Sequence, residues 1–180
     1  YKRQLLMADD ISDFQIEGIS IGDSLLNYME KKEIKNNELN YFANKRKYYV
    51  VGITDNLSNF DQIEIYLRSN DKKYKIKTIS GMIMIDNLNK CLSKKKKIIK
   101  DIDSLFSDVT QDSGVKANEF DKTGNSKQYV NQYIFNKDNH IRVECMQWSK
   151  KMKDEKGFTN TLNVVVMSHE ISNWIASGYK

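Results

Sequence analysis

The feature that most constrains the fold is a change of hydrophobic period at Asp86. Before it, apolar and polar residues alternate over 63–68, a polar turn follows, and 74–85 returns as the partner strand, where Gly81 is expected to mark a bulge. After it, apolar residues recur at helical spacing over 86–106. We therefore expect an antiparallel hairpin followed by a long central helix.

Further strands are expected on both sides of this helix. Residues 48–53 form a compact β-prone run before the hairpin. Residues 129–135 and 140–148 give a second hairpin pattern with its turn at 136–139, and 162–167 is a short strand. The pattern predicts two antiparallel meanders, one on each side of the helix.

The segments near the two ends predict shorter helices. Gly22 or Asp23 can cap a helix that begins near Ser24, and the polar stretch 30–40 has room for one more helical turn. Ser168 is placed to cap a final helix that carries two isoleucines and a tryptophan. The order is then helix, three strands, long helix, three strands and helix.

This order predicts the fold class and the domain organisation. We expect an α+β fold, one domain over 1–180, built from two units of a helix plus a three-stranded antiparallel meander at 13–85 and 86–177, with a C-terminal helix. Residues 107–127 and 149–160 are polar and are expected to be loops. The first is long enough to be either mobile or functional.

Three parts of the chain carry a resemblance. The segments IEGISIGDSLLNYM, ISGMIMIDNLNKC, and RVECMQWS with SHEISNWIASGY resemble a group of uncharacterised small exported bacterial proteins, which has no assigned activity. In architecture, the helix-then-meander unit used twice is similar to the tandem fold of β-lactamase inhibitory proteins and of small outer-membrane assembly lipoproteins. The resemblance implies export and a fold, and it assigns no functional residue.

Charge and composition bear on partners. The net charge of +5 comes from 29 basic and 24 acidic residues that are interleaved, and few of the basic residues are arginine, so we expect no nucleic-acid partner. Lys94 and Lys97 face away from the apolar stripe of the central helix, which Lys95 alone interrupts, and are expected to be solvated. Abundant lysine, asparagine and isoleucine without proline is typical of an AT-rich genome. No apolar run is long enough for a membrane span.

The sharpest chemical motif is Asp121-Lys122-Thr123-Gly124. It matches the start of the phosphorylated motif of P-type ATPases, but Asn125 replaces the next threonine and no buried strand precedes it. We interpret it as a surface turn and expect that substituting Asp121 leaves stability nearly unchanged.

Other candidate chemistry is sparse. His140 and His169 have no second histidine or cysteine at ligand spacing, so we expect no metal site. Ser168 lies next to His169, but adjacent side chains in a first helical turn diverge. We therefore assign no catalytic, cofactor-binding or metal-binding residue and expect no cofactor.

The two cysteines are more informative. Cys91 lies on the apolar stripe of the central helix, and Cys145 shares strand parity with Ile141 and Val143, so both are expected to face the same core. Two buried thiols in a cytosolic protein would also explain the pattern. With the resemblance to exported proteins, we favour a Cys91–Cys145 disulfide and a periplasmic or secreted protein. Because the sequence begins at Tyr1 without methionine, an upstream export signal is one candidate for a removed segment.

Two functions remain open. The first is a non-catalytic exported protein that binds another protein or a cell-envelope component through its sheet face or the 107–127 loop. The second is a small hydrolase-like enzyme whose site is assembled from scattered acidic residues and a histidine. A cluster around a histidine in a pocket would favour the enzyme, and an exposed aromatic patch would favour the binding protein.

Overall fold

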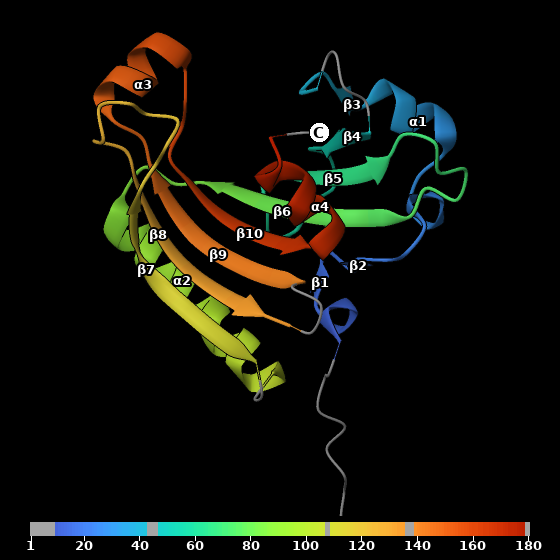
Figure 1. The fold of residues 1–180 in the computed structure, drawn as a ribbon, viewed down its shortest axis with the longest axis horizontal. Coiled ribbons are helices and arrows are strands. Elements are labelled where there is room, and N and C mark those ends of the chain that lie inside the picture. The colour runs from blue at the N-terminus through green and yellow to red at the C-terminus, as the bar shows by residue number, and fades with distance from the viewer. Residues whose placement is uncertain (1–9, 43–46, 107–108, 136–138, 179–180) are drawn as a thin grey trace, which may run out of the picture.

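The strands of this chain build one continuous antiparallel sheet, shown in the computed structural model of Figure 1, which describes residues 10–42, 47–106, 109–135 and 139–178. The sheet has eight strands in the order β3-β4-β5-β6-β10-β9-β8-β7. Their bounds are Glu38–Leu39 (β3), Tyr48–Ile53 (β4), Gln62–Arg68 (β5), Ile76–Met84 (β6), Thr110–Ala117 (β7), Lys127–Ile134 (β8), His140–Gln147 (β9) and Thr161–Met167 (β10).

Helices lie on both faces of this sheet (Figure 1). The α-helices are α1 (Lys31–Asn36), α2 (Leu88–Leu105), α3 (Lys150–Lys156) and α4 (His169–Ala176). Before them come the small hairpin of β1 (Gln15–Ile16) and β2 (Ile19–Ser20) and the 3-10 helices η1 (Ile11–Asp13) and η2 (Leu25–Asn27). The expected class, α+β with antiparallel strands and a C-terminal helix, is confirmed.

The two halves of the chain meet at the centre of the sheet. Residues 13–85 supply β3 to β6 of this sheet and residues 86–177 supply β7 to β10, so each half gives the sheet four strands where three were predicted. The predicted meanders are present as β4-β5-β6 and β8-β9-β10. Strand β10 pairs with β6, with Val164 opposite Gly81, and joins the halves without a break. That the halves repeat one unit stays a prediction.

Helix α2 is the central helix expected from the period change. Asn87 begins it, because its side chain accepts a hydrogen bond from a backbone N–H of the first turn. Its apolar stripe faces the sheet, where Cys91 and Ile102 are fully buried. Lys94 and Lys97 are exposed, as predicted.

Hydrophobic residues form cores on opposite faces of the sheet. The main core lies beneath α2, α1 and the N-terminal segment and includes Ile16, Ile34, Ile65, Ile79, Ile102, Val143 and Val164. The second core lies beneath α4 and consists of Tyr48, Val165, Met167, Ile171 and Trp174, with Phe42 and Tyr66 packed against it. Among the described helices, α4 supplies the helical residues of the second core, Ile171 and Trp174.

Both predicted loops contain regular structure. Residues 110–117 of the 107–127 stretch form β7, and residues 150–156 of the 149–160 stretch form α3. Every residue of β7 is exposed, so no buried face imposes the alternation by which strands are recognised. Helix α3 has seven residues, too few for a clear helical period. Residues 136–138 of the second predicted turn and residues 107 and 108 lie outside the described residues.

Two local expectations near glycines are also wrong. The segment after Gly22 forms a 3-10 helix, and its cap is Ser24, whose side chain accepts from Leu26 N–H at 3.4 Å. Gly81 is paired in regular register on both sides and marks no bulge. A Cβ at Gly81 would lie 2.6 Å from ring carbons of Phe60, so glycine is there because an aromatic ring packs directly on the backbone.

Candidate binding cleft

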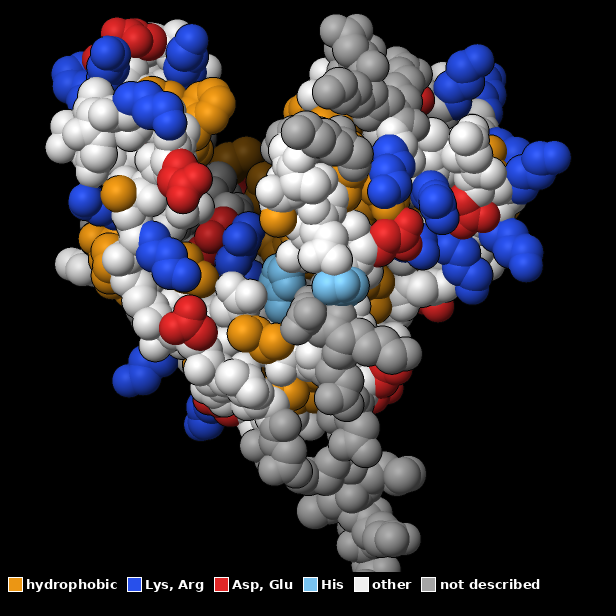
Figure 2. Space-filling view, viewed as in Figure 1, with side chains coloured by type: hydrophobic (Ala, Val, Ile, Leu, Met, Phe, Trp, Pro, Cys, Tyr) orange, Lys and Arg blue, Asp and Glu red, His pale blue; other side chains and the backbone are white. Residues whose placement is uncertain are grey.

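One face of the sheet is open between α4 and a projecting part of the molecule, formed by α3 and the ends of β7, β8 and β9, which we call the arm. Side chains alternate along β9, and Cys145 points to α2, to which it is disulfide-bonded, so Arg142 and Glu144 point to the opposite face. Figure 2 shows this face hollowed between the part that carries α4 and the arm formed by α3 and the ends of β7, β8 and β9. We call this hollow the cleft.

The floor of the cleft is a mixed polar and apolar surface. The register of the central strands β6, β10 and β9 places Ser80, Met82, Asn163, Arg142 and Glu144 on this face, beside Val165 of the core beneath α4. Glu144 is 5% exposed, pairs with Arg142 at 3.4 Å from Nε, and accepts a hydrogen bond from Asn163 Nδ2 at 3.3 Å. The Arg142 side chain is 34% exposed. A buried carboxylate thus forms an ion pair with a partly exposed guanidinium on the floor.

Three aromatic residues from separate segments gather at the α3 end of the cleft. Trp148 directly follows β9, Phe158 lies between α3 and β10, and Phe120 lies between β7 and β8. The ring centroids are 4.5 Å apart for Trp148 and Phe158 and 5.9 Å for Phe120 and Phe158. Phe120 is 64% exposed. Figure 2 shows hydrophobic side chains at the end of this arm, beside the hollow.

The spacing along β9 sets the length of the cleft. Arg142 and Trp148 are six residues apart, and a strand rises about 3.3 Å per residue, so the charged and aromatic ends are roughly 20 Å apart. This is the length of an extended segment of about six residues.

A buried aspartate holds the turn that carries Phe120. Asp121 is 3% exposed, and its carboxylate accepts hydrogen bonds from the hydroxyl and backbone N–H of both Thr123 and Ser126, at 2.5 to 3.1 Å. The hydrogen bonds from Ser126 and Thr123 hold the pKa of Asp121 well below its usual range. Ser126 Oγ also accepts from Ser149 N–H at 2.9 Å, which ties the turn to α3. The prediction that Asp121 lies on the surface is therefore wrong, and its burial and hydrogen bonds lead us to expect a loss of stability on substitution.

The opposite wall of the cleft is fixed by α4. Trp174 packs against Tyr48 and Phe42, with ring centroids 4.8 and 4.9 Å away. Glu170, in the first turn of α4, accepts hydrogen bonds from the Tyr48 hydroxyl and from Lys77, whose Nζ is 3.0 Å away. Burial alone would raise the pKa of Glu170, but these hydrogen bonds and the nearby positive charges outweigh it and lower the pKa. The Glu170 carboxylate therefore links α4 to strands β4 and β6 of the sheet.

A second buried carboxylate, that of Glu64, lies on the same face of the sheet as Glu144 and far from it. Glu64 on β5 accepts from Tyr41 O–H at 2.5 Å and from Gln62 Nε2 at 3.1 Å. Burial raises the pKa of Glu64, against the lowering effect of the Tyr41 hydrogen bond. Glu64 and Glu144 are three strand spacings apart, roughly 14 Å, and have separate partners. Carboxylates that share acid and base work on one bond lie closer together.

The two histidines lie together at the lower end of the hollow in Figure 2. His140 is buried and faces Met167 across the β9–β10 pair, and His169 begins α4. Asn173 Nδ2 lies 2.6 Å from His169 Nε2, one helical turn away. Ser168 stands at the predicted cap position of α4, but its side chain makes no capping hydrogen bond.

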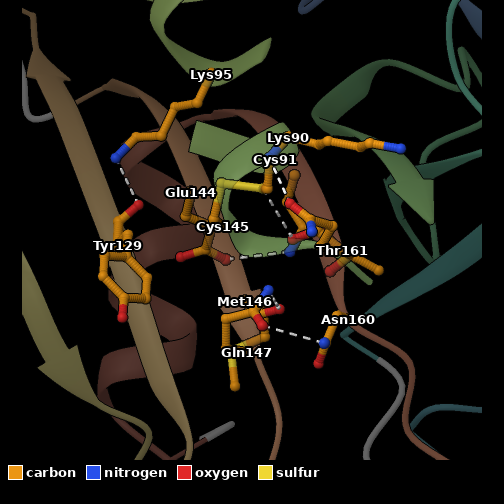
Figure 3. The surroundings of a disulfide bond; sticks show 12 residues. Lys90, Cys91, Lys95, Tyr129, Glu144, Cys145, Met146, Gln147, Asn160 and Thr161 are labelled. Carbon is orange, nitrogen blue, oxygen red and sulfur yellow. Dashed lines mark hydrogen bonds between the residues drawn. A yellow bond between two sulfur atoms is a disulfide. The ribbon is translucent and has the colours of Figure 1, made fainter. Parts of the chain in front are cut away.

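The Cys91–Cys145 disulfide predicted from the sequence is present (Figure 3). Its Cα atoms are 6.0 Å apart and both residues are fully buried, so it fastens α2 to β9 behind the cleft floor. Beside it, the Lys95 amine donates to the Tyr129 carbonyl at 2.6 Å. Burial lowers the pKa of Lys95, and the charge of Glu144 opposes this effect. The residue that interrupts the apolar stripe is therefore itself buried.

Other hollows of the described chain lie elsewhere. One of about 410 Å³ adjoins α1 and is lined by Lys31, Ile34, Lys35, Glu38, Tyr49, Ser69 and Tyr74. Burial raises the pKa of Tyr49 there to about 12. A second, of about 380 Å³, lies on the other side of α1 and includes Glu17 and Tyr28. Neither hollow is lined by a histidine.

Sequence reasoning missed the cleft because its residues come from three strands and three connecting segments. The available signal was the polar pair Arg142 and Glu144, which alternate with buried residues of β9, and the lone aromatic Phe120 in a polar stretch. Their meeting on one face depends on β10 lying between β6 and β9, which no local pattern indicates.

Comparisons with known proteins add no relative. A scan against known protein families, a search of curated proteins and a search of solved structures each found no match. None of the described helices combines the length and the apolar character needed to cross a membrane. Within the same residues, no group of three or more histidine, cysteine, aspartate or glutamate side chains is arranged to hold a metal ion.

Proposed function

We propose that this chain is a non-catalytic binding protein of an oxidising compartment, periplasmic or secreted, and that its cleft holds an extended segment of a partner protein. One observation carries the proposal: a sheet face left open between α4 and the arm, with exposed Phe120 near one end and partly exposed Arg142 near the other. Exposed aromatic residues and arginine are the side chains that most often anchor protein interfaces.

The chemistry of the two ends describes the segment that would fit. A guanidinium binds a carboxylate through paired hydrogen bonds, so an acidic side chain is expected near Arg142. The aromatic cluster of Trp148, Phe158 and Phe120 favours an apolar side chain at the other end. With about 20 Å between the ends, the two partner side chains would be about six residues apart in an extended chain. The net charge of +5 favours the approach of an acidic partner.

The separation of the buried acids argues against the hydrolase-like alternative. Glu64 and Glu144 are roughly 14 Å apart and each is already engaged by neighbouring side chains. The exposed aromatic cluster is the feature that favours binding over catalysis. A binding protein also needs no cofactor.

The disulfide supports the proposed compartment. Disulfides persist in oxidising compartments and are rare in the cytosol. The Cys91–Cys145 bond joins residues far apart in the chain and is fully buried, which is typical of a structural bond rather than a redox site. The resemblance of several segments to small exported bacterial proteins points the same way.

A selection from displayed random peptides tests the proposal. We expect the selected peptides to share an acidic and an apolar residue about six positions apart. Their dissociation constants should rise about tenfold or more for Phe120→Ser and for Arg142→Lys. Lysine keeps the positive charge of arginine but lacks the paired donors with which a guanidinium binds a carboxylate. Lys97→Ser, on the opposite face, is the matched control and should bind as the wild type does. Equal binding of the selected peptides by the wild type and by all three variants would contradict the proposal.

A further inference from the structure

Strand β7 is an open edge of the sheet. It is the last strand in the sheet order, and all eight of its residues are exposed. Figure 1 shows it on the outer side of the arm. An edge of this length presents backbone N–H and C=O groups that can pair with another strand.

The ladder between β7 and β8 shows which groups are free for pairing. Asn118 N–H donates to Ser126 O at 3.0 Å, one step beyond the Ala117–Lys127 pair and in the same register. Hydrogen-bonded pairs alternate with non-hydrogen-bonded pairs in an antiparallel ladder. The even-numbered residues of β7 therefore bond to β8. The odd-numbered residues, Gln111, Ser113, Val115 and Ala117, direct their N–H and C=O groups outward.

The charged residues of β7 are placed so that two antiparallel copies of this strand can pair an aspartate with a lysine. If Gly114 lies opposite Gly114 of a second copy, Asp112 lies opposite Lys116 in both halves of the pair. In this register Ser113 lies opposite Val115, and both direct their backbone groups outward. The glycine pair and the charged pairs then fall on non-hydrogen-bonded positions, where facing side chains come closest.

We infer that two copies of this chain associate through β7 and β7 in an antiparallel pair, with the two-fold axis at Gly114. The partner is a second copy of the chain because one register joins the outward backbone groups and also pairs each aspartate with a lysine. The association continues the sheet from one copy into the other. The cleft of each copy stays outside the contact between the two β7 strands. The inference therefore does not depend on the proposed function.

The charges specify the register more than they add affinity. Asp112 and Lys116 already lie 3.7 Å apart within one copy, with side chains 62% and 58% exposed, so pairing exchanges one exposed ion pair for another. The gain comes from the hydrogen bonds of the four odd-numbered residues of each copy. A pair of strands alone buries little surface, so we expect a weak dimer that forms at high protein concentration.

A cysteine at the axis tests the geometry. The only cysteines of the sequence form the internal disulfide, so a new thiol has no competitor. A Cβ at Gly114 meets no atom within 4 Å, so Gly114→Cys should fold. With oxidised glutathione as oxidant, we expect Gly114→Cys to form a covalent dimer, since non-hydrogen-bonded pairs have Cα atoms about 4.5 Å apart. The matched control, Ser113→Cys, lies opposite Val115 and should remain largely monomeric.

Charge reversal tests the register. Asp112→Lys places lysine opposite lysine at two points, and we expect it to weaken dimerisation about tenfold in sedimentation equilibrium. Asp112→Lys combined with Lys116→Asp restores both pairs and should recover the wild-type constant. A wild-type protein that stays monomeric up to about a millimolar would overturn the inference. Equal cross-linking by the two cysteine variants, or no recovery in the double reversal, would overturn it as well.

Discussion

Removing the Cys91–Cys145 bond should cost a large part of the stability of this protein. The bond joins positions 54 residues apart, and both residues are fully buried. In the chain-entropy description, closing a loop of that length stabilises the folded state by about 4 kcal/mol. Since native domains are stable by about 5 to 15 kcal/mol in total, this one bond is a large share. For a chain of 180 residues, we expect the melting temperature to fall by roughly 8 to 16 °C.

The assay follows urea unfolding with and without a reducing agent. Because both sulfurs are buried, the reductant must be present while the chain is unfolded, so samples are equilibrated from the unfolded state. The variant Cys91→Ala with Cys145→Ala serves as the control, because its unfolding midpoint should not respond to reductant. Far-ultraviolet circular dichroism of the reduced protein should remain that of the native fold. Equal midpoints for oxidised and reduced wild type would refute the reasoning, as would two free thiols in unreduced native protein.

Three further substitutions, the first of them with a matched control, test local packing and charge. Gly81→Ala pushes a methyl group into the Phe60 ring and should destabilise by about 1 to 3 kcal/mol, whereas Gly114→Ala, in open space, should be close to neutral by urea midpoint. Asp121→Asn should lower the melting temperature and expose the adjacent turn to proteolysis. Because the folded-state pKa of Asp121 is lowered, the difference from wild type should be full above the ordinary pKa near 4 and shrink in more acidic solution; a pH-independent difference would contradict this. Glu170→Gln should destabilise by about 1 to 2 kcal/mol at neutral pH, and the loss should fade below pH 4 by the same linkage; no loss at pH 7 would show that α4 is held by packing alone.

The parts of the fold that the sequence predicts are those with a buried face. The period change at Asp86 locates α2, alternation locates β5, and β-prone runs and hairpin patterns locate β4, β6, β8 and β9, because core packing selects apolar residues on the buried face. The disulfide follows from the same reasoning, since Cys91 and Cys145 each lie on a core-facing position. The fully exposed strand β7 has no such face, so its sequence resembles a loop.

The cleft is harder to predict because it depends on strand order. Arg142 and Asn163 come from strands joined through α3, and only the pairing of β9 with β10 brings them to one surface. Asp121 resembles a surface residue because carboxylates are usually exposed, and its burial depends on donors supplied by Thr123 and Ser126. Polar contacts of this kind leave no period in the sequence.

The most direct test of the binding cleft is site-specific photo-cross-linking in the native envelope fraction. A photoreactive phenylalanine analogue replaces Phe120 beside the cleft, and in a matched protein it replaces Lys97 on the opposite face. The cleft predicts that the probe at position 120 attaches to one continuous segment of a partner, mapped by mass spectrometry, with an acidic residue about six positions from the apolar attachment point. The probe at position 97 should not attach to that segment. The same partner segment recovered equally from both positions, or no partner recovered from position 120, would contradict the account.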